Sequence, residues 1–167
     1  MTREHLGTYL NDHLTGFNVA IEILDHLAAE TSAALTVAGL RNELNEDRHE
    51  LRVLMNRLHV VESRVRKAGS WIAEGLSELK LEVDDEPNGP LRRLERLEQL
   101  AIGIQGKVAL WKALGVALGS HGELGGLDYT RLIHRGQEQY DQVETLRLEA
   151  ARVALVLFTP RPRATSS

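Results

Sequence analysis

Hydrophobic residues recur every three or four positions along almost the whole chain, which is the repeat of an α-helix with one buried face. No segment alternates strictly between apolar and polar residues, as a half-buried strand does. The pattern therefore predicts an all-α protein. Four long helices are expected, from just after Thr2 to about Glu30, from about 35 to 58, from Pro90 to about 118, and from Asp128 to about 157.

Stretches rich in turn-forming residues separate these helices, and the clearest is "EVDDEPNGP" at 82–90. Apolar positions before it predict one short additional helix, at about 63–80, in the connection between the second and third long helices. Whether residues 33–80 form one bent helix or two stays open. The arrangement predicts an antiparallel four-helix bundle with one additional short helix in the middle crossover. We expect the bundle to form a single domain at 1–158, followed by a flexible basic tail at 159–167.

Composition supports this picture and narrows the possible functions. The chain has 167 residues, of which 43% are hydrophobic and only 4% aromatic, so helices are favoured over sheet. The net charge is −4 and acids alternate with bases, so we expect no nucleic-acid partner. No apolar run approaches the roughly 20 residues that span a bilayer, so we expect no membrane association. Cysteine is absent, which excludes thiolate zinc sites and fits a cytoplasmic location.

Four segments of the chain carry a family resemblance. They are "YLNDHLTGFNVAIEIL", "EDRHELRVLMNRL", "LERLEQLAIGIQGKVALWKAL" and "ETLRLEAARVAL". Together they resemble an uncharacterised family of bacterial proteins with a ferritin-like helical bundle. The likeness extends over most of residues 5–157, and it implies the fold but no established activity. Membership of the ferritin-like superfamily at large would imply a di-iron carboxylate centre with a Glu-x-x-His motif on each of two helices.

The chain contains one literal Glu-x-x-His motif, Glu46 to His49. Successive residues of an α-helix are rotated by about 100° around its axis. If Leu44 and Leu51 face the core, this rotation directs the side chains of Glu46 and His49 toward solvent. Carboxylates at the edges of apolar faces are usually partners of nearby Arg and Lys, so we expect no metal or other cofactor. The alternative is an iron or manganese site assembled from inward and edge residues, namely His13, Asp47, Glu50, Glu98 and Glu144.

The same angular count places four polar residues inside apolar faces: His13, Asp47, Gln139 and Arg147. An unpaired charge in a protein core is costly. We therefore expect a buried polar cluster in which Asp47 pairs with Arg147 and His13 lies alongside, taking the place of metal ions. In a competing interpretation, Arg147 extends its charged head to solvent and His13 is an isolated core histidine.

Four glycines lie in the interiors of the predicted helices, and two of them, Gly115 and Gly136, fall on apolar faces. Gly103, Gly106, Gly115 and Gly136 are costly in helix interiors, so they predict close approach between helices. Trp111 lies on an apolar face and is expected to pack in the core rather than hold a cofactor.

Additional apolar positions lie outside the main faces of the first and last helices. Val19, Ile23 and Leu27 form a second strip that one bundle need not fully bury, and Leu148 and Leu155 lie off the last helix's main face. Extra apolar surface of this kind predicts a homo-oligomer, most simply a homodimer, and the alternative is that the short helix at about 63–80 covers it.

These observations predict a non-enzymatic structural or interaction protein with a degenerate ferritin-like core. The alternative is a ferritin-like di-iron or manganese carboxylate protein that acts as an oxidoreductase or handles iron. A third possibility is a binder of small ligands with a pocket around His13. The sequence has neither the "HExxH" motif of zinc proteases nor the "GxSxG" motif of serine hydrolases, and no catalytic residue is assigned.

Overall fold

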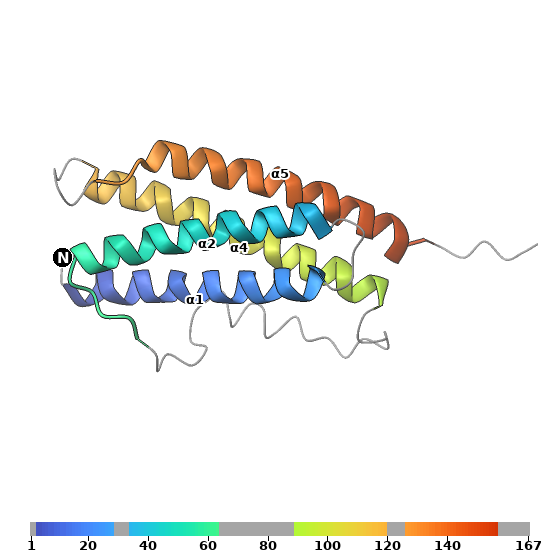
Figure 1. Cartoon of the computed structure of the whole chain (residues 1–167), viewed down its shortest axis with the longest axis horizontal. Helices are drawn as coiled ribbons and strands as arrows, with labels where there is room; N and C mark the ends of the chain where they lie inside the picture. The colour runs from blue at the N-terminus through green and yellow to red at the C-terminus, as the bar shows by residue number, and fades with distance from the viewer. Residues whose placement is uncertain (1–2, 29–33, 64–88, 120–125, 157–167) are drawn as a thin grey trace, which may run out of the picture.

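The computed structural model describes residues 3–28, 34–63, 89–119 and 126–156. All regular secondary structure in these ranges is helical (Figure 1). The helices are α1 (Arg3–Ala28), α2 (Ala34–Arg57), α4 (Pro90–Leu118) and α5 (Tyr129–Ala154). The four predicted long helices are thus confirmed. The predicted short helix at 63–80 falls almost entirely outside the described residues, and the predicted tail at 159–167 lies wholly outside them.

Two of the helices begin as local chemistry requires. Pro90 is the first residue of α4, where a missing N–H costs nothing because no intrahelical partner exists for it. Asp128 caps α5, since its side chain accepts a hydrogen bond from the Arg131 backbone N–H at 2.9 Å. Helix α5 ends at Ala154, three residues before the predicted end.

The four helices form a bundle in which neighbours along the chain do not all alternate in direction. In Figure 1, α1 and α2 run antiparallel, as do α4 and α5, whereas α2 and α4 run in the same direction. Helix α2 therefore ends at the opposite end of the bundle from the start of α4. Helix α1 lies against α2 and α4, and α5 lies against α4 and α2, with the most extensive packing between α4 and α5.

Leucine dominates the core between the helices. Trp111, predicted to be a core residue, is fully buried and lies 6.4 Å from Phe17, measured between ring centroids. Of the second apolar strip on α1, Ile23 and Leu27 are buried within the single chain, whereas Val19 is only partly buried. The physical reason is that α1 is flanked by both α2 and α4, which widens its buried face.

The chain beyond α2 turns back onto α1 through a residue in the left-handed region, His59, with φ of 52°. A buried asparagine on α1 holds the segment that follows. The side-chain amide of Asn11 donates to the Val61 carbonyl at 3.2 Å, and its Oδ1 accepts from the Ser63 N–H at 2.7 Å. Asn11 thus fixes the direction in which the chain leaves α2.

Glycine has different roles at two of the positions predicted to mark close helix contacts. A Cβ added at Gly136 of α5 would lie 2.6 Å from Val108 Cγ2 of α4, so the predicted close approach is confirmed there. At Gly103 of α4 an added Cβ would meet no atom within 4 Å. The prediction for Gly103 is therefore wrong, because this glycine faces open space rather than a neighbouring helix.

Substituting Gly136 by Ala should destabilise the protein even though Ala is the better helix former. The new methyl group would overlap the stiff, buried Val108 side chain, at a cost of about 1–3 kcal/mol in the free energy of unfolding. Gly39→Ala in α2 is the matched control, because its added Cβ meets nothing within 4 Å and should stabilise the helix by about 0.5–1 kcal/mol. Urea denaturation would measure both, and equal effects would contradict the close contact.

Candidate functional site: a buried ion cluster

Three buried polar side chains from three different helices meet in the middle of the bundle. They are Asp47 on α2, Lys107 on α4 and Gln139 on α5, and each is at most 4% exposed. Charged residues are almost never fully buried unless they are paired, so this cluster is the most unusual chemical feature of the described core. Because it lies where α2, α4 and α5 converge, it is the candidate functional site.

The ammonium group of Lys107 lies at the centre of the cluster. Its Nζ donates to Asp47 Oδ2 at 2.5 Å and also donates to Gln139 Oε1. The Gln139 amide nitrogen in turn donates to Glu43 Oε2 at 2.9 Å and lies 3.5 Å from Asp47 Oδ2. Gln139 therefore links the lysine to a second carboxylate of α2.

Arg135 extends the cluster to the surface. One guanidinium nitrogen donates to Asp47 Oδ1, and the other donates to Glu46 Oε2 at 2.8 Å. One turn away, Arg131 donates to Glu50 Oε1 at 2.8 Å. The two arginines of α5 and the two glutamates of α2 thus form two rungs of ion pairs across antiparallel helices. Both oxygens of Asp47 accept a hydrogen bond from a cation.

Burial and charge act in opposite directions on Lys107. Burial lowers the pKa of this ammonium group, since removal from water disfavours the charged form. Asp47 and, more weakly, Glu43 stabilise the charged form, whereas Arg135 opposes it. The ion pair with Asp47 is therefore what keeps a charged lysine in the core.

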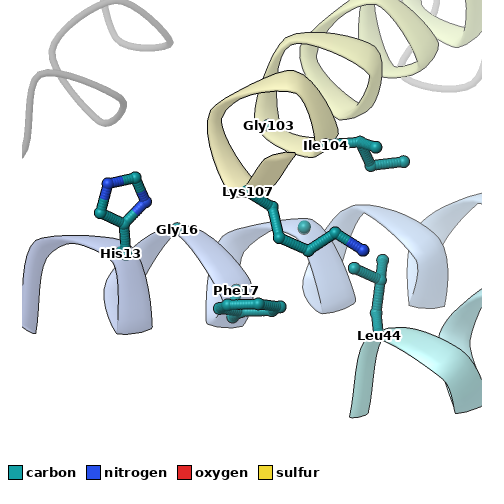
Figure 2. A pocket seen from close by; sticks show the side chains of 8 residues that line it. His13, Gly16, Phe17, Leu44, Gly103, Ile104 and Lys107 are labelled. Carbon is teal, nitrogen blue, oxygen red and sulfur yellow. The ribbon is translucent and has the colours of Figure 1, made fainter. Parts of the chain in front are cut away.

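A narrow pocket lies beside the cluster, between α1, α2 and α4. Phe17, Ala20, Leu44 and Ile104 form its apolar walls, and the other lining residues are His13, Gly16, Gly103 and Lys107. In Figure 2 the Lys107 side chain runs from α4 over the Phe17 ring toward Leu44, while His13 stands at the opposite side of the pocket. The pocket has an empty volume of about 280 Å³, which includes solvent at its mouth.

His13 is buried on α1, as predicted, and it lies outside the hydrogen bonds described for Asp47 and Gln139. The described hydrogen bonds of Asp47 and Gln139 connect them with Lys107, Arg135, Glu43 and each other. The His13 ring instead packs edge-on against Tyr9, with centroids 4.6 Å apart. Burial lowers the pKa of His13 from 6.5 to about 4, and Asp12 only partly offsets this effect, so the imidazole is neutral at pH 7.

The predicted pairing of Asp47 with Arg147 is wrong. Asp47 pairs with Lys107 and Arg135, whereas Arg147 is only half-buried and pairs with Glu144 at 2.7 Å and with Glu98 at 3.5 Å. These bonds raise the pKa of Arg147 and lower that of Glu144.

The reason for the error is axial position. The ion pairs show that Arg135 lies at the same level along the bundle as Glu46, and Arg131 at the same level as Glu50. Because α2 and α5 are antiparallel, a step of four residues toward the C-terminus of α2 matches a step of four residues toward the N-terminus of α5. By that spacing, Arg147 lies level with the start of α2 at Ala34, and not with Asp47. An angular count reports the face of a helix on which a residue lies, but not its level along the axis.

The alternative metal ligands do not come together with Asp47. Glu50 pairs with Arg131, while Glu98 and Glu144 both pair with Arg147. Within the described ranges no group of three or more His, Asp or Glu side chains is placed to hold a metal ion. The Glu46–His49 motif is exposed, as predicted, and lines a surface groove with Arg131 and Arg135.

Lys107 and Arg135 are not among the predicted site residues, although the spacing of both along the chain carried a signal. Lys107 lies three residues after Ile104 and four before Trp111, which is the spacing of residues that share a helical face. Arg135 lies three residues after Leu132 and four before Gln139. Both positions follow the periodicity that identified Asp47.

Comparisons with known proteins add no relative to this picture. No family model matches the chain, and neither a curated protein nor a solved structure does. The cluster therefore has to be interpreted from its own chemistry.

Burial of neutral His13 should make stability depend on pH. In the unfolded chain the His13 imidazole binds a proton near pH 6.5, whereas in the folded chain it does so only near pH 4. The contribution of neutral His13 to the free energy of unfolding is therefore fully present above pH 6.5 and is lost as the pH falls toward 4. Between pH 7 and pH 5 the loss should be about 2 kcal/mol. Urea titrations at both pH values should show that His13→Leu removes this part of the dependence. The exposed His49→Gln should retain it, and a pH dependence unchanged in His13→Leu would refute the assignment.

Proposed function

We propose that the protein is a non-enzymatic helical bundle, a structural or interaction protein, whose ferritin-like core has an ion cluster in place of a metal centre. The observation that carries this proposal is the Lys107 ammonium between Asp47 and Gln139. The order of helix directions supports a ferritin-like arrangement, since α2 and α4 run the same way and α4 begins at the opposite end of the bundle from the end of α2 (Figure 1).

Charge explains why such a cluster suits an architectural role. In a di-metal bundle, cations neutralise inward carboxylates from several helices. Here Lys107 of α4 and Arg135 of α5 neutralise Asp47 of α2. Each ion pair therefore joins two helices, and separating the helices would leave a charge unpaired in the core.

Metal analysis combined with a variant of Asp47 tests the proposal. Protein purified without chelators and incubated with ferrous iron or manganese should hold neither in stoichiometric amount. Asp47→Asn should lower the free energy of unfolding by about 3–5 kcal/mol, because it leaves the Lys107 charge uncompensated. Adding Lys107→Met to Asp47→Asn should recover part of that loss, since the double variant buries no unpaired ammonium.

Asp141→Asn is the control for this experiment, because it removes an exposed carboxylate from α5 and should change stability by no more than about 0.5 kcal/mol. Stoichiometric iron or manganese in the wild-type protein, lost in a folded Asp47→Asn variant, would overturn the proposal in favour of the metalloprotein alternative.

We further propose a cytoplasmic homodimer. Support for the dimer comes from apolar side chains near the C-terminal end of α5: Leu148, Val153, Leu155 and Val156 are 47–67% exposed. Exposed apolar groups gathered at one end of a molecule are typical of association surfaces. Helix α4 is long and apolar enough to cross a membrane by composition alone, but half of that stretch is buried in the bundle, as in a core helix.

Sedimentation equilibrium tests the dimer. The wild-type protein should sediment as two chains, and the combined variant Leu148→Glu and Leu155→Glu should sediment as one, with an unchanged helical circular dichroism spectrum. Val116→Glu, at an 88% exposed position on α4, should leave the dimer intact. A wild-type monomer over the whole concentration range, or a dimer that survives the double substitution, would show that this surface is not an interface.

A further inference from the structure

The contacts among Lys107, Gln139 and Asp47 bring together an amine, an amide and a carboxylate in the core. The Lys107 Nζ donates to Gln139 Oε1, and the amide carbon Cδ lies one bond of about 1.2 Å beyond that oxygen. Asp47 Oδ2 lies 2.5 Å from Lys107 Nζ and 3.5 Å from Gln139 Nε2. One carboxylate oxygen therefore reaches both nitrogens that must exchange protons if the acyl group of the amide passes to the amine.

The surroundings of Lys107 favour its action as a nucleophile. Only the unprotonated amine has a lone pair with which to attack a carbonyl carbon. Burial lowers the pKa of Lys107, against the opposing effect of Asp47, and removal of a lysine from water is a general way in which proteins activate it. The Asp47 carboxylate, at 2.5 Å, is the acceptor for the proton that the ammonium must release.

Close packing of α4 against α5 holds the two reacting groups together. A Cβ added at Gly136 would lie 3.5 Å from Lys107 Cε and 3.8 Å from its Nζ, so the backbone of α5 passes directly beside the end of the lysine. Gln139 follows Gly136 by three residues and so shares its helical face. Lys107, Asp47 and Gln139 are each at most 4% exposed, so water is largely excluded as a competing nucleophile.

Gln139 is a better acyl donor than the carboxylates around it. Asp47 carries a negative charge, which repels a nucleophile from its carbon, and the Lys107 and Arg135 cations stabilise that charge. The amide of Gln139 is neutral. Its Oε1 accepts the N–H of Lys107, which polarises the carbonyl group toward attack, and its Nε2 is directed by the bond to Glu43 Oε2 at 2.9 Å.

We propose that Lys107 and Gln139 join in an intramolecular amide bond, with Asp47 as the proton carrier. Asp47 takes a proton from the Lys107 ammonium, and the lone pair of the resulting amine forms a bond to Gln139 Cδ. Asp47 passes that proton to Nε2 and takes a second one from Nζ. The Cδ–Nε2 bond then breaks, and ammonia leaves with the second proton as ammonium. Asp47 ends as the carboxylate with which it began.

The reaction replaces a buried ammonium by a neutral amide and releases the charge to water, which favours the product. The new bond links α4 to α5 across 32 residues of chain, so it also limits the freedom of the unfolded state. This inference goes beyond the architectural role proposed above, which the ion pairs fulfil before any bond forms. An absent bond would therefore leave the metal and stability tests of that role unaffected.

Intact mass spectrometry of the full chain tests the proposal. Protein refolded from guanidinium chloride and incubated in buffer should lose about 17 Da, the mass of one ammonia molecule, and an assay of the buffer should find one ammonium ion per chain. Proteolysis should yield a branched peptide that joins Lys107 to Gln139. The same chain kept in guanidinium chloride should retain its full mass, because only the fold brings the two side chains together.

Variants separate this bond from other losses of ammonia. Gln139→Met and Lys107→Met should each retain the full mass, whereas Gln137→Met and Lys112→Met, at exposed positions on the same two helices, should react like the wild type. Asp47→Asn should slow the loss at least about a hundredfold, as expected for removal of a general acid–base group.

Circular dichroism would show that each protein compared is folded. An unchanged mass in the folded wild-type protein would overturn the proposal, as would a loss of ammonia that persists in Gln139→Met. A loss of about 18 Da with a peptide that joins Lys107 to Asp47 would mean that the carboxylate is the acyl donor and would overturn the assignment of Gln139. An unchanged rate in a folded Asp47→Asn variant would overturn the role of Asp47.

Discussion

The charge of one buried lysine is the constraint on which the centre of this bundle depends. Lys107 enters the core from α4, where burial opposes its charge, and it is held there by Asp47 of α2 and Gln139 of α5. Removing either partner would leave a polar group without its bond in a medium that cannot replace it. The apolar packing of four helices could tolerate many rotations and shifts along the axis. The cluster selects one of them, because its hydrogen bonds form only at one level of each helix.

Other contacts in the protein are compatible with the same shift of the helices along one another. The ion pairs Arg131–Glu50 and Arg135–Glu46 fix how far α5 is shifted along α2. Gly136 lies next to Arg135 in sequence, and its missing side chain allows α5 to approach Val108 and the stem of Lys107. The close approach of α4 and α5 and the position of the lysine are therefore parts of the same arrangement. The same arrangement also leaves the small pocket beside Phe17, which Gly16 of α1 and Gly103 of α4 help to line.

Helix positions, caps and most of the core could be predicted because they depend on neighbours in the sequence. Pro90 and Asp128 mark helix starts through local backbone chemistry, and the apolar period of three to four places Leu44, Leu51 and Trp111 inside. The burial of His13, Asp47 and Gln139 followed from the same period. Arg147 fell on the right face by that count, yet it lies at another level of the bundle, where Glu144 and Glu98 bind it.

The sequence by itself thus determined an all-α chain, the approximate limits of its long helices, and three of the polar groups that are buried. Only the tertiary structure decided which cation neutralises Asp47, that Ile23 and Leu27 are covered within one chain, and that Gly103 faces open space. The physical reason is that periodicity defines directions around a single helix axis. Partners are chosen by how far two helices are shifted along each other, and that shift results from contacts between residues as far apart in the chain as Asp47 and Arg135.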